Sequence, residues 1–413
     1  MAYHLFSCKI DTMKKRLYFI LLSISFYCFF LALSLPFSPV KAEDAVVSIR
    51  SFGAVGDGVT DDSDALRRAL EYAGKHAIPL LLESGHIYLA QGEIPLYSNT
   101  TVYLNGATIT DGYPGGVTDP YVQWGNGLRF INAAETLTAS GYGALHDVTI
   151  SGGTFNGRYF DTVSGVTFAL LHGERITLED LTFVDCMAGT HIIDLGGCKN
   201  VVIRDCTFTG AYIAPKEWQY REAIQLDSAL YKGMPYWDST PVTIAYDGLA
   251  CEQITIDGCR FSKGNGTHAM NAIGTHTAYG FFNHDITITG NTFFDCRSYA
   301  IRFPKVFRVT VTQNRFIQNQ SDHAKKDAFL KIYTTKNRLP YLEANSDITI
   351  RQNTFSSSSS RRLLPISITG NKQARTHTVS MTSNTFLGTY KKKNRKKLCT
   401  LRYVDPDSFV WKN

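Results

Sequence analysis

An eight-residue pattern recurs eight times in this chain of 413 residues, and it constrains the fold more than any other feature. Each copy alternates apolar and polar residues and ends on a phenylalanine, as in ITITGNTF (286–293) and VTVTQNRF (309–316). The copies end at Phe155, Phe183, Phe208, Phe261, Phe293, Phe316, Phe355 and Phe386. Such alternation predicts short strands with one buried face.

A strand of this length cannot bury its apolar face alone, whereas stacked copies bury one continuous core. The shortest intervals between successive phenylalanines are 23 and 25 residues, from Phe293 to Phe316 and from Phe183 to Phe208. That length holds a coil of three short strands and leaves no room for a crossover helix. The sequence therefore predicts an all-β fold, a parallel β-helix over residues 46–390.

Two interior ladders follow from the register of the repeats. The phenylalanines are expected to stack in one, and Asn291, Asn314, Asn353 and Asn384 in another at a bend, where an amide satisfies backbone groups. Cys206 and Cys259 occupy the same position as these asparagines. Because no CxxC motif or Cys/His cluster occurs, we expect mostly unpaired, buried thiols and no metal site.

A second strand follows each phenylalanine and has its own register. Ile193, Ile224, Ile273, Ile301 and Leu330 align as an apolar column that faces inward. Their next neighbours then point outward, because successive side chains alternate between the faces of a strand. The outward positions are Asp194, Gln225, Gly274, Arg302 and Lys331, followed two residues on by Gly196, Asp227, His276 and Pro304. The register thus predicts a solvent-facing stripe of mixed charge.

Residues 1–42 are typical of a secretory signal peptide. Lys14-Lys15-Arg16 precedes an apolar run of 19 residues, Leu17 to Leu35, and small residues suit cleavage after Ala42. Met13 begins a compact signal of its own and is an alternative start. An uncleaved anchor is the alternative interpretation, since 19 residues can just span a bilayer. With the leader removed, we expect no membrane span and a location outside the cell or in the cell envelope.

The formal charge of +6 is concentrated in two segments. The leader contributes +4 and the run KKKNRKK (391–397) contributes +6, so the rest of the chain is mildly acidic. A basic nucleic-acid groove is therefore not expected. The segment 391–413 is set apart as basic, and Lys391 to Lys397 form either a solvated run or a contact to an anionic cell envelope.

The segment SFGAVGDGVTDDSDAL (51–66) resembles the opening of the pectate-lyase-like superfamily of secreted right-handed β-helices. The resemblance implies a right-handed, single-stranded β-helix with an N-terminal capping helix within residues 51–75. Asp61 or Asp62 can cap that helix, which would close the end of the solenoid. The Asp cluster lacks the spacing of an EF-hand, so calcium is unsupported and no cofactor is predicted.

The chain is also distantly similar to polygalacturonase-like glycosidases of this fold. YAIRFP (299–304) looks like their arginine-containing strand, and NAIGTHT (271–277) like the strand after their catalytic histidine. Glu222 falls where one of their paired carboxylates lies. Arg221 and His191 stand where that family has its other acids, so the acid set is not preserved.

Insertions cluster around the strand that begins at Glu222, and they are rich in aromatic residues. Trp218, Tyr236 and Trp237 lie there, and flat rings with polar tips suit the apolar faces of sugars. The alternative is that these rings only pack the loops onto the solenoid. Insertions on one face of a solenoid favour a binding face, here a glycan cleft.

The stripe offers the groups that glycoside hydrolysis requires. The Cα atoms of Asp194 and Asp227 are expected on the order of 8 Å apart, given about 4.8 Å between rungs and 3.3 Å between residues. Asp194, Glu222, Asp227 and His276 are the candidate catalytic residues. The candidate substrate-binding residues are His191, Gln225, Asn271, Arg302, Lys331, Trp218, Tyr236 and Trp237.

Three functions remain open from the sequence. The first is a secreted glycoside hydrolase that acts on a polysaccharide through paired carboxylates. The second is a lyase or epimerase of a uronate-containing glycan, with Arg302 and Lys331 stabilising the developing negative charge. The third is a glycan-binding surface protein without activity.

Overall fold

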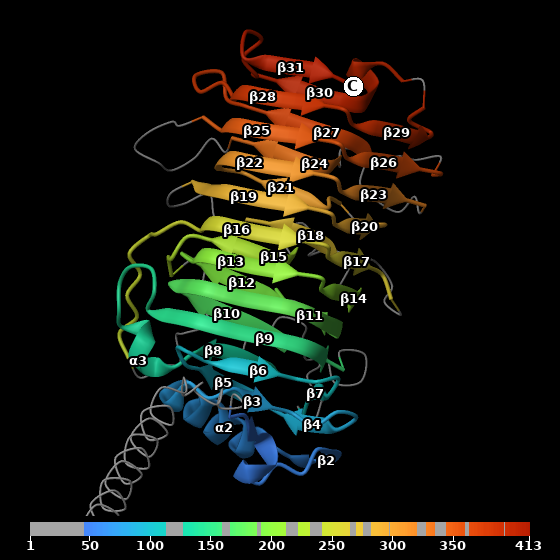
Figure 1. Cartoon of the computed structure of the whole chain (residues 1–413). Coiled ribbons are helices and arrows are strands. Elements are labelled where there is room, and N and C mark those ends of the chain that lie inside the picture. Colours follow the sequence, from blue (N-terminus) through green and yellow to red (C-terminus); the bar gives the residue numbers. More distant parts are fainter. Residues whose placement is uncertain are drawn as a thin grey trace, which may run out of the picture. The chain divides into compact units, whose positions relative to one another are not determined.

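The computed structural model describes residues 45–112, 127–158, 166–187, 191–211, 222–231, 242–264, 270–275, 282–296, 298–319, 328–334, 344–359, 363–391 and 393–413. Val46–Asn413 form one compact unit. Within it the described residues build two parallel sheets, sheet A with 21 strands and sheet B with ten. Figure 1 shows these strands stacked as successive coils in sequence order. The right-handed parallel β-helix is confirmed.

Sheet A supplies two of the strands in each coil. The first row contains β1 (Val47–Ser48), β3 (Leu80–Leu81), β6 (Thr101–Tyr103), β9 (Leu145–Asn156), β11 (Gly173–Met187), β13 (Lys199–Arg204), β16 (Glu252–Asp257), β19 (Asn283–Thr289), β22 (Val306–Thr312), β25 (Ser346–Arg351), β28 (His377–Thr382) and β31 (Phe409–Lys412). The second row contains β2 (Asp57–Asp61), β4 (Ile87–Ala90), β7 (Thr108–Asp111), β14 (Thr207–Ala211), β17 (Arg260–Ser262), β20 (Thr292–Phe294), β23 (Arg315–Gln318), β26 (Thr354–Ser357) and β29 (Thr385–Gly388). The long strands β9 and β11 run through both rows, because each pairs with strands of both.

Sheet B supplies the third strand and carries the candidate site. It contains β5 (Gly92–Leu96), β8 (Leu128–Asn132), β10 (Val166–Leu171), β12 (Ile193–Gly196), β15 (Glu222–Asp227), β18 (Asn271–Gly274), β21 (Ile301–Phe303), β24 (Ala328–Tyr333), β27 (Leu364–Thr369) and β30 (Cys399–Arg402). Strands β30 and β31 lie within the segment 391–413, so both sheets continue past residue 390.

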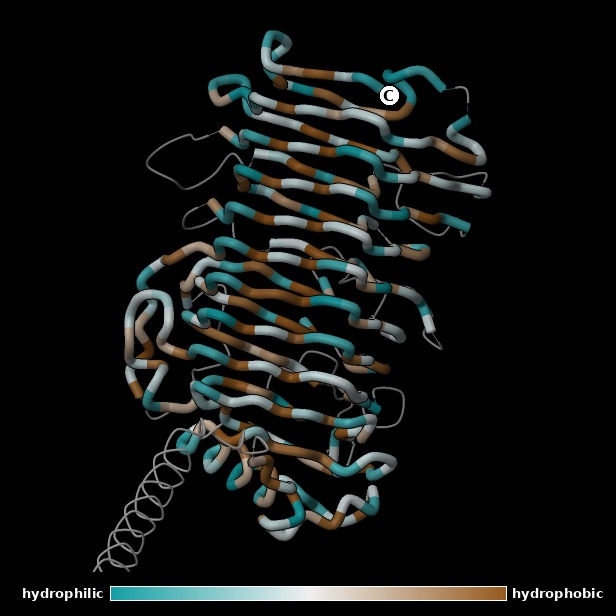
Figure 2. Tube along the Cα trace, in the orientation of Figure 1, coloured by the Kyte–Doolittle hydropathy of each residue, from teal (hydrophilic) through white to brown (hydrophobic). Residues whose placement is uncertain are grey.

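The core consists of the side chains that the repeats direct inward. The alternating bands in Figure 2 follow the alternation of apolar and polar residues along each strand. The eight repeat phenylalanines stack in register, with centroids of successive rings 4.7–5.4 Å apart. This confirms the predicted ladder, and Trp411 continues it beyond Phe386.

The asparagine ladder is confirmed as well. The backbone N–H of Asn291 donates to Oδ1 of Asn314 at 2.9 Å, and Asn314 donates in the same way to Asn353 at 3.0 Å. The N–H of Cys259 donates to Oδ1 of Asn291 at 2.8 Å, so the cysteine continues the ladder. The seven cysteines of the described residues are all buried and unpaired, as predicted.

In the described parts of the chain, four helical elements accompany the sheets. They are a 3-10 helix (Ile49–Phe52), α2 (Ser63–His76), α3 (Ala134–Leu137) and α5 (Arg395–Leu398). Helix α2 buries Ala65, Leu66, Ala69, Leu70 and Ala73 in the main core and contacts β5. That α2 closes the end of the solenoid stays a prediction.

The aspartates before α2 hold the glycine-rich turn. Oδ1 of Asp61 accepts the N–H of Ser63 at 2.9 Å at the start of the helix. The carboxylate of Asp62 instead accepts the N–H groups of Val55 and Gly56 at 2.7 and 3.0 Å. The turn and the start of the helix in the segment 51–66 are thus joined by hydrogen bonds.

Candidate functional site

Sheet B brings most of the predicted site residues onto neighbouring strands. Ile193 pairs with Ile224, Ile224 with Ile273, and so on through Ile301 to Leu330, which confirms the inward column. On the outward face Asp194 lies opposite Gln225, and Asp227 lies opposite Gly196. Arg302 and Lys331 are register partners two strands further on.

The predicted exposure of this stripe is wrong. Asp194, Glu222, Gln225 and Asp227 are each 0% exposed, and of the stripe residues that the structure describes only Lys331 is half-buried. The alternation of a strand determines on which side of the sheet a residue lies, but not whether other segments cover that side. The predicted stripe therefore contains buried charges, which require partners within the protein.

Part of the outer face of sheet B is covered by another segment of the chain. Ile131, Leu171 and Ala229 form a second apolar cluster, separate from the main core. The segment 242–250 packs against it through Val242, Ile244, Tyr246 and Leu249. The outer side of sheet B therefore has an apolar patch at Ile131, Ala169 and Leu171 of β8 and β10, and carries Asp194, Gln225 and Asp227 on β12 and β15.

Glu222 is the centre of a buried polar cluster. Its Oε1 accepts hydrogen bonds from the Tyr299 hydroxyl at 2.7 Å and from Nε of Arg302 at 3.0 Å. Arg302 also donates to the Tyr333 hydroxyl at 2.7 Å and to the Thr275 carbonyl at 2.8 Å. These contacts join β15, β21 and β24 across the outer face of sheet B.

Burial and charge act together in this cluster. Burial raises the pKa of Tyr299 well above its usual range, and the neighbouring Glu222 carboxylate adds to that rise. For Arg302 burial acts in the opposite direction, yet the Glu222 carboxylate raises the pKa of the guanidinium. Tyr299 thus stays a neutral hydrogen-bond donor and Arg302 a cation.

The hydrogen bonds that the Glu222 side chain accepts within this cluster all go to Oε1 and leave its second carboxylate oxygen unoccupied. Among the described residues Oε2 of Glu222 accepts no hydrogen bond, and Nδ1 of His191 lies 4.0 Å from it. That nitrogen instead lies 2.7 Å from the Glu222 backbone carbonyl. Asn271 uses its amide oxygen to accept the N–H groups of Ser298 and Tyr299 at 3.2 and 3.4 Å.

The two candidate aspartates lie in a neighbouring part of the same face. The side-chain amide of Gln225 donates to Oδ1 of Asp227 at 3.2 Å. Asp194 is on the preceding strand, opposite Gln225, as the register predicted. Lys331 places its ammonium 5.6 Å from the ring centroid of Tyr333. The remaining candidates, His276, Trp218, Tyr236 and Trp237, lie outside the described residues.

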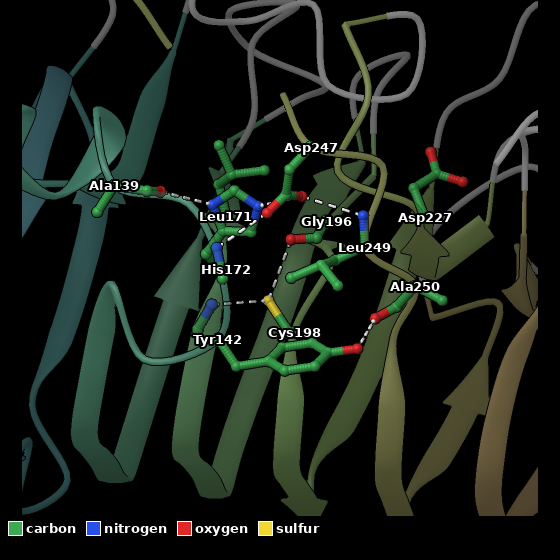
Figure 3. Close-up of polar contacts among 12 residues, drawn as sticks. Ala139, Tyr142, Leu171, His172, Gly196, Cys198, Asp227, Asp247, Leu249 and Ala250 are labelled. Atoms are coloured by element: carbon green, nitrogen blue, oxygen red, sulfur yellow. Dashed lines mark hydrogen bonds and ion pairs between the residues drawn. The ribbon is translucent and has the colours of Figure 1, made fainter. Parts of the chain in front are cut away.

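Sequence reasoning missed a second polar pair, His172 and Asp247, which Figure 3 shows. His172 is 0% exposed, and its Nε2 lies 2.9 Å from Oδ1 of Asp247. Its Nδ1 lies 3.1 Å from the Ala139 carbonyl, so both ring nitrogens face oxygen acceptors. Asp247 also accepts the N–H groups of Gly141 and Leu249.

This pair fastens two segments to the end of β10. The Tyr142 hydroxyl adds a hydrogen bond to the Ala250 carbonyl at 2.8 Å (Figure 3). Burial raises the pKa of Tyr142 above its usual range, so the hydroxyl stays protonated as the donor. No motif marks these residues, because His172 and Asp247 are 75 positions apart in the sequence.

Two further findings concern all of the residues that the structure describes. Among the described residues no three His, Cys, Asp or Glu side chains gather as metal ligands would. Within that same part of the chain, no helix has the length and apolar character needed to cross a membrane.

Comparison with known proteins supports the fold. No protein-family model matches the chain. The chain is 28% identical over 344 residues to plasmin and fibronectin-binding protein A of Streptococcus pneumoniae (strain ATCC BAA-255 / R6), which covers 76% of this chain and 46% of that protein. The chain therefore spans less than half the length of this curated relative.

Solved structures show the same architecture. The crystal structure of PfbA, a surface adhesin of Streptococcus pneumoniae, matches with a TM-score of 0.71 and 24% identity, over 85% of this chain and 80% of that one. A tailspike protein of E. coli bacteriophage HK620, solved in complex with a pentasaccharide, matches with a TM-score of 0.50 and 12% identity, over 89% and 67% of the two chains. The chain thus shares the right-handed parallel β-helix fold of these structures.

Proposed function

We propose that this chain is an extracellular adhesion protein, in which the β-helix is a rigid scaffold that binds a protein of its surroundings. The observation that carries this proposal is the burial of Glu222 together with its contacts to neighbouring side chains. Its side chain is 0% exposed, ion-paired with Arg302 and hydrogen-bonded to Tyr299. A general acid or base must reach the substrate, whereas this side chain is buried and its Oε1 is held by Arg302 and Tyr299.

The likeness to an adhesin supports the same conclusion. The relative is named for binding plasmin and fibronectin, and 76% of this chain aligns with it. Since an alignment over 76% of the chain must include much of the β-helix unit Val46–Asn413, fibronectin and plasmin are the first partners to test. A location at the cell surface or outside the cell belongs to this proposal.

The test is a direct binding measurement with the full chain. Immobilised fibronectin and plasmin are each exposed to the protein in surface plasmon resonance, with serum-free bovine casein as the unrelated control. We expect saturable binding to fibronectin or plasmin and none to casein. Absence of saturable binding to both proteins contradicts the proposal.

A glycoside hydrolase is the second candidate, because Asp194 and Asp227 lie on adjacent strands of one sheet face. Incubation with a glycan panel distinguishes the chemistries. New reducing ends without an ultraviolet-absorbing double bond indicate hydrolysis, whereas an unsaturated sugar indicates elimination and inverted uronates indicate an epimerase. If cleavage occurs and is abolished by Asp194→Asn or Asp227→Asn, the enzyme interpretation replaces the adhesin.

A further inference from the structure

The last coil of the solenoid carries a dense cluster of positive charge. Residues 372–413 contain ten Lys and Arg but only two acids, Asp405 and Asp407, while the whole chain has a net charge of +6. We call its exposed cations on α5, β30 and β31 the terminal basic cluster. They are Arg395, Lys396, Lys397, Arg402 and Lys412.

Helix α5 contacts β30, and Arg395 of α5 lies over the ring of Phe409 on β31, so the helix lies beside the final strands of both sheets. Asn394 fixes the start of α5, since its side chain accepts the N–H of Lys397. The cluster is therefore part of the folded coil. A short, capped helix holds the cations of the basic run in a defined place.

The cluster lacks the acidic partners that neutralise cations elsewhere on the surface. On sheet A Arg175 pairs with Asp147, Arg204 with Glu179 and Arg308 with Asp285. Among the described residues no ion pair involves any member of the terminal basic cluster. Uncompensated like charges raise the free energy of the isolated protein, and an anionic ligand would relieve that cost.

Aromatic rings lie among these charges. The guanidinium of Arg395 is 5.6 Å from the ring centroid of Phe409, and that of Arg402 is 4.9 Å from the ring of Tyr403. Phe409 and Trp411 are half-buried at the end of the core. A ring beside a cation matches a sugar that has an apolar face and a charged substituent.

We propose that the terminal basic cluster binds a sulfated polysaccharide, with the cations contacting sulfates and the exposed ring edges contacting sugars. A second copy of the chain is a poor occupant, because two such ends would repel each other. A lipid surface is also disfavoured, since Trp411 stacks on Phe386 and Phe409 packs against the core. These rings are held in place and are not available for insertion among acyl chains.

The experiment uses the full chain and immobilised heparin in biolayer interferometry at about 0.15 M salt. The variant K396E/K397E is compared with the control R260E/K263E, which makes the same change in formal charge at β17 and the residue after it. We expect K396E/K397E to weaken heparin binding on the order of tenfold, and the control to stay within about twofold. Circular dichroism melting verifies that both variants fold.

A third variant tests the contribution of the rings. Phe409→Leu keeps an apolar side chain and every charge, so we expect a several-fold loss of heparin affinity with an unchanged salt dependence. Unchanged affinity limits the site to charge alone and overturns the role of the ring.

Three results overturn the proposal as a whole. They are no binding to heparin, an equal loss in the two double variants, and tighter binding to phosphatidylglycerol vesicles or duplex DNA than to heparin. Fibronectin and plasmin binding is measured with the same variants. Because purified heparin contains neither protein, failure here and failure of the adhesion proposal are separate results.

Discussion

The guanidinium Nε of Arg302 lies 3.0 Å from Oε1 of Glu222, although the two residues are 80 positions apart in the sequence. Both are nearly fully buried on the outer face of sheet B. A buried charge that loses its partner is costly, whereas replacing the whole pair by apolar groups often is not. The contribution of this ion pair can therefore be measured from the unfolding free energies of variants.

Arg302→Met is expected to lower the free energy of unfolding by about 3–5 kcal/mol, because it leaves the Glu222 carboxylate buried without its cation. The double variant E222L/R302M should recover most of that loss. Lys331→Met serves as the matched control, since Lys331 is the half-buried register partner on the next strand. Urea unfolding gives all three values. Equal losses for Met at 302 and 331 would show that the ion pair is unimportant.

We expect any side chain at Gly274 to destabilise the protein as long as Glu222 keeps its position. A Cβ at this residue would lie 2.7 Å from Cγ and Oε1 of Glu222. Gly274→Ala should therefore cost about 1–3 kcal/mol, and Glu222→Ala in the same chain should remove that extra cost. Urea unfolding of the two single variants and the double variant measures the coupling. Additive losses contradict the contact.

Truncation of a phenylalanine should lower stability most near the middle of the phenylalanine ladder. Phe261 is 0% exposed and stacks on Phe208 at 4.7 Å and Phe293 at 5.2 Å. Phe261→Ala is expected to lower stability by about 3–5 kcal/mol through a cavity that the rigid coil cannot close. Phe386→Ala near the end, where the ring is half-buried, should cost clearly less. Similar midpoints of thermal unfolding would contradict this order.

Protonation of Asp247 should account for part of the loss of stability in acid. Burial opposes ionisation, but the N–H groups of Leu249 and Gly141 and the neighbouring His172 together lower the pKa of Asp247 below its usual value of 3.8. Its stabilising contribution is therefore complete above the unfolded-state pKa and is lost as the pH falls through the lower, folded-state pKa. Asp247→Asn should flatten the decline in the urea midpoint below about pH 4.

Asp407→Asn, on the exposed turn before β31, is the control for losing one carboxylate. It should leave the acid decline close to that of the unaltered chain. An Asp247→Asn variant with the same pH dependence as the unaltered chain would show that the His172–Asp247 pair does not contribute to acid sensitivity.

The sequence by itself determined the coil. A two-residue alternation repeated with a terminal phenylalanine fixes which side chains face inward, so Phe155 to Phe386 and the column from Ile193 to Leu330 could be aligned by register. The same periodicity placed Asp194, Gln225, Arg302 and Lys331 on the outer face of one sheet. It also put the asparagines and Cys259 in one ladder, because each coil repeats the same bend.

Only the tertiary structure decided what those outward residues do. Periodicity assigns a side of a sheet, but burial of that side depends on segments that come from elsewhere in the chain, such as 242–250 over Leu171. It cannot reveal that Arg302 reaches past Gly274 to Glu222, or that His172 meets Asp247, because such contacts depend on side-chain length and loop path. For this reason most of the stripe that alternation predicted to face solvent is buried, and its Arg302 pairs with Glu222.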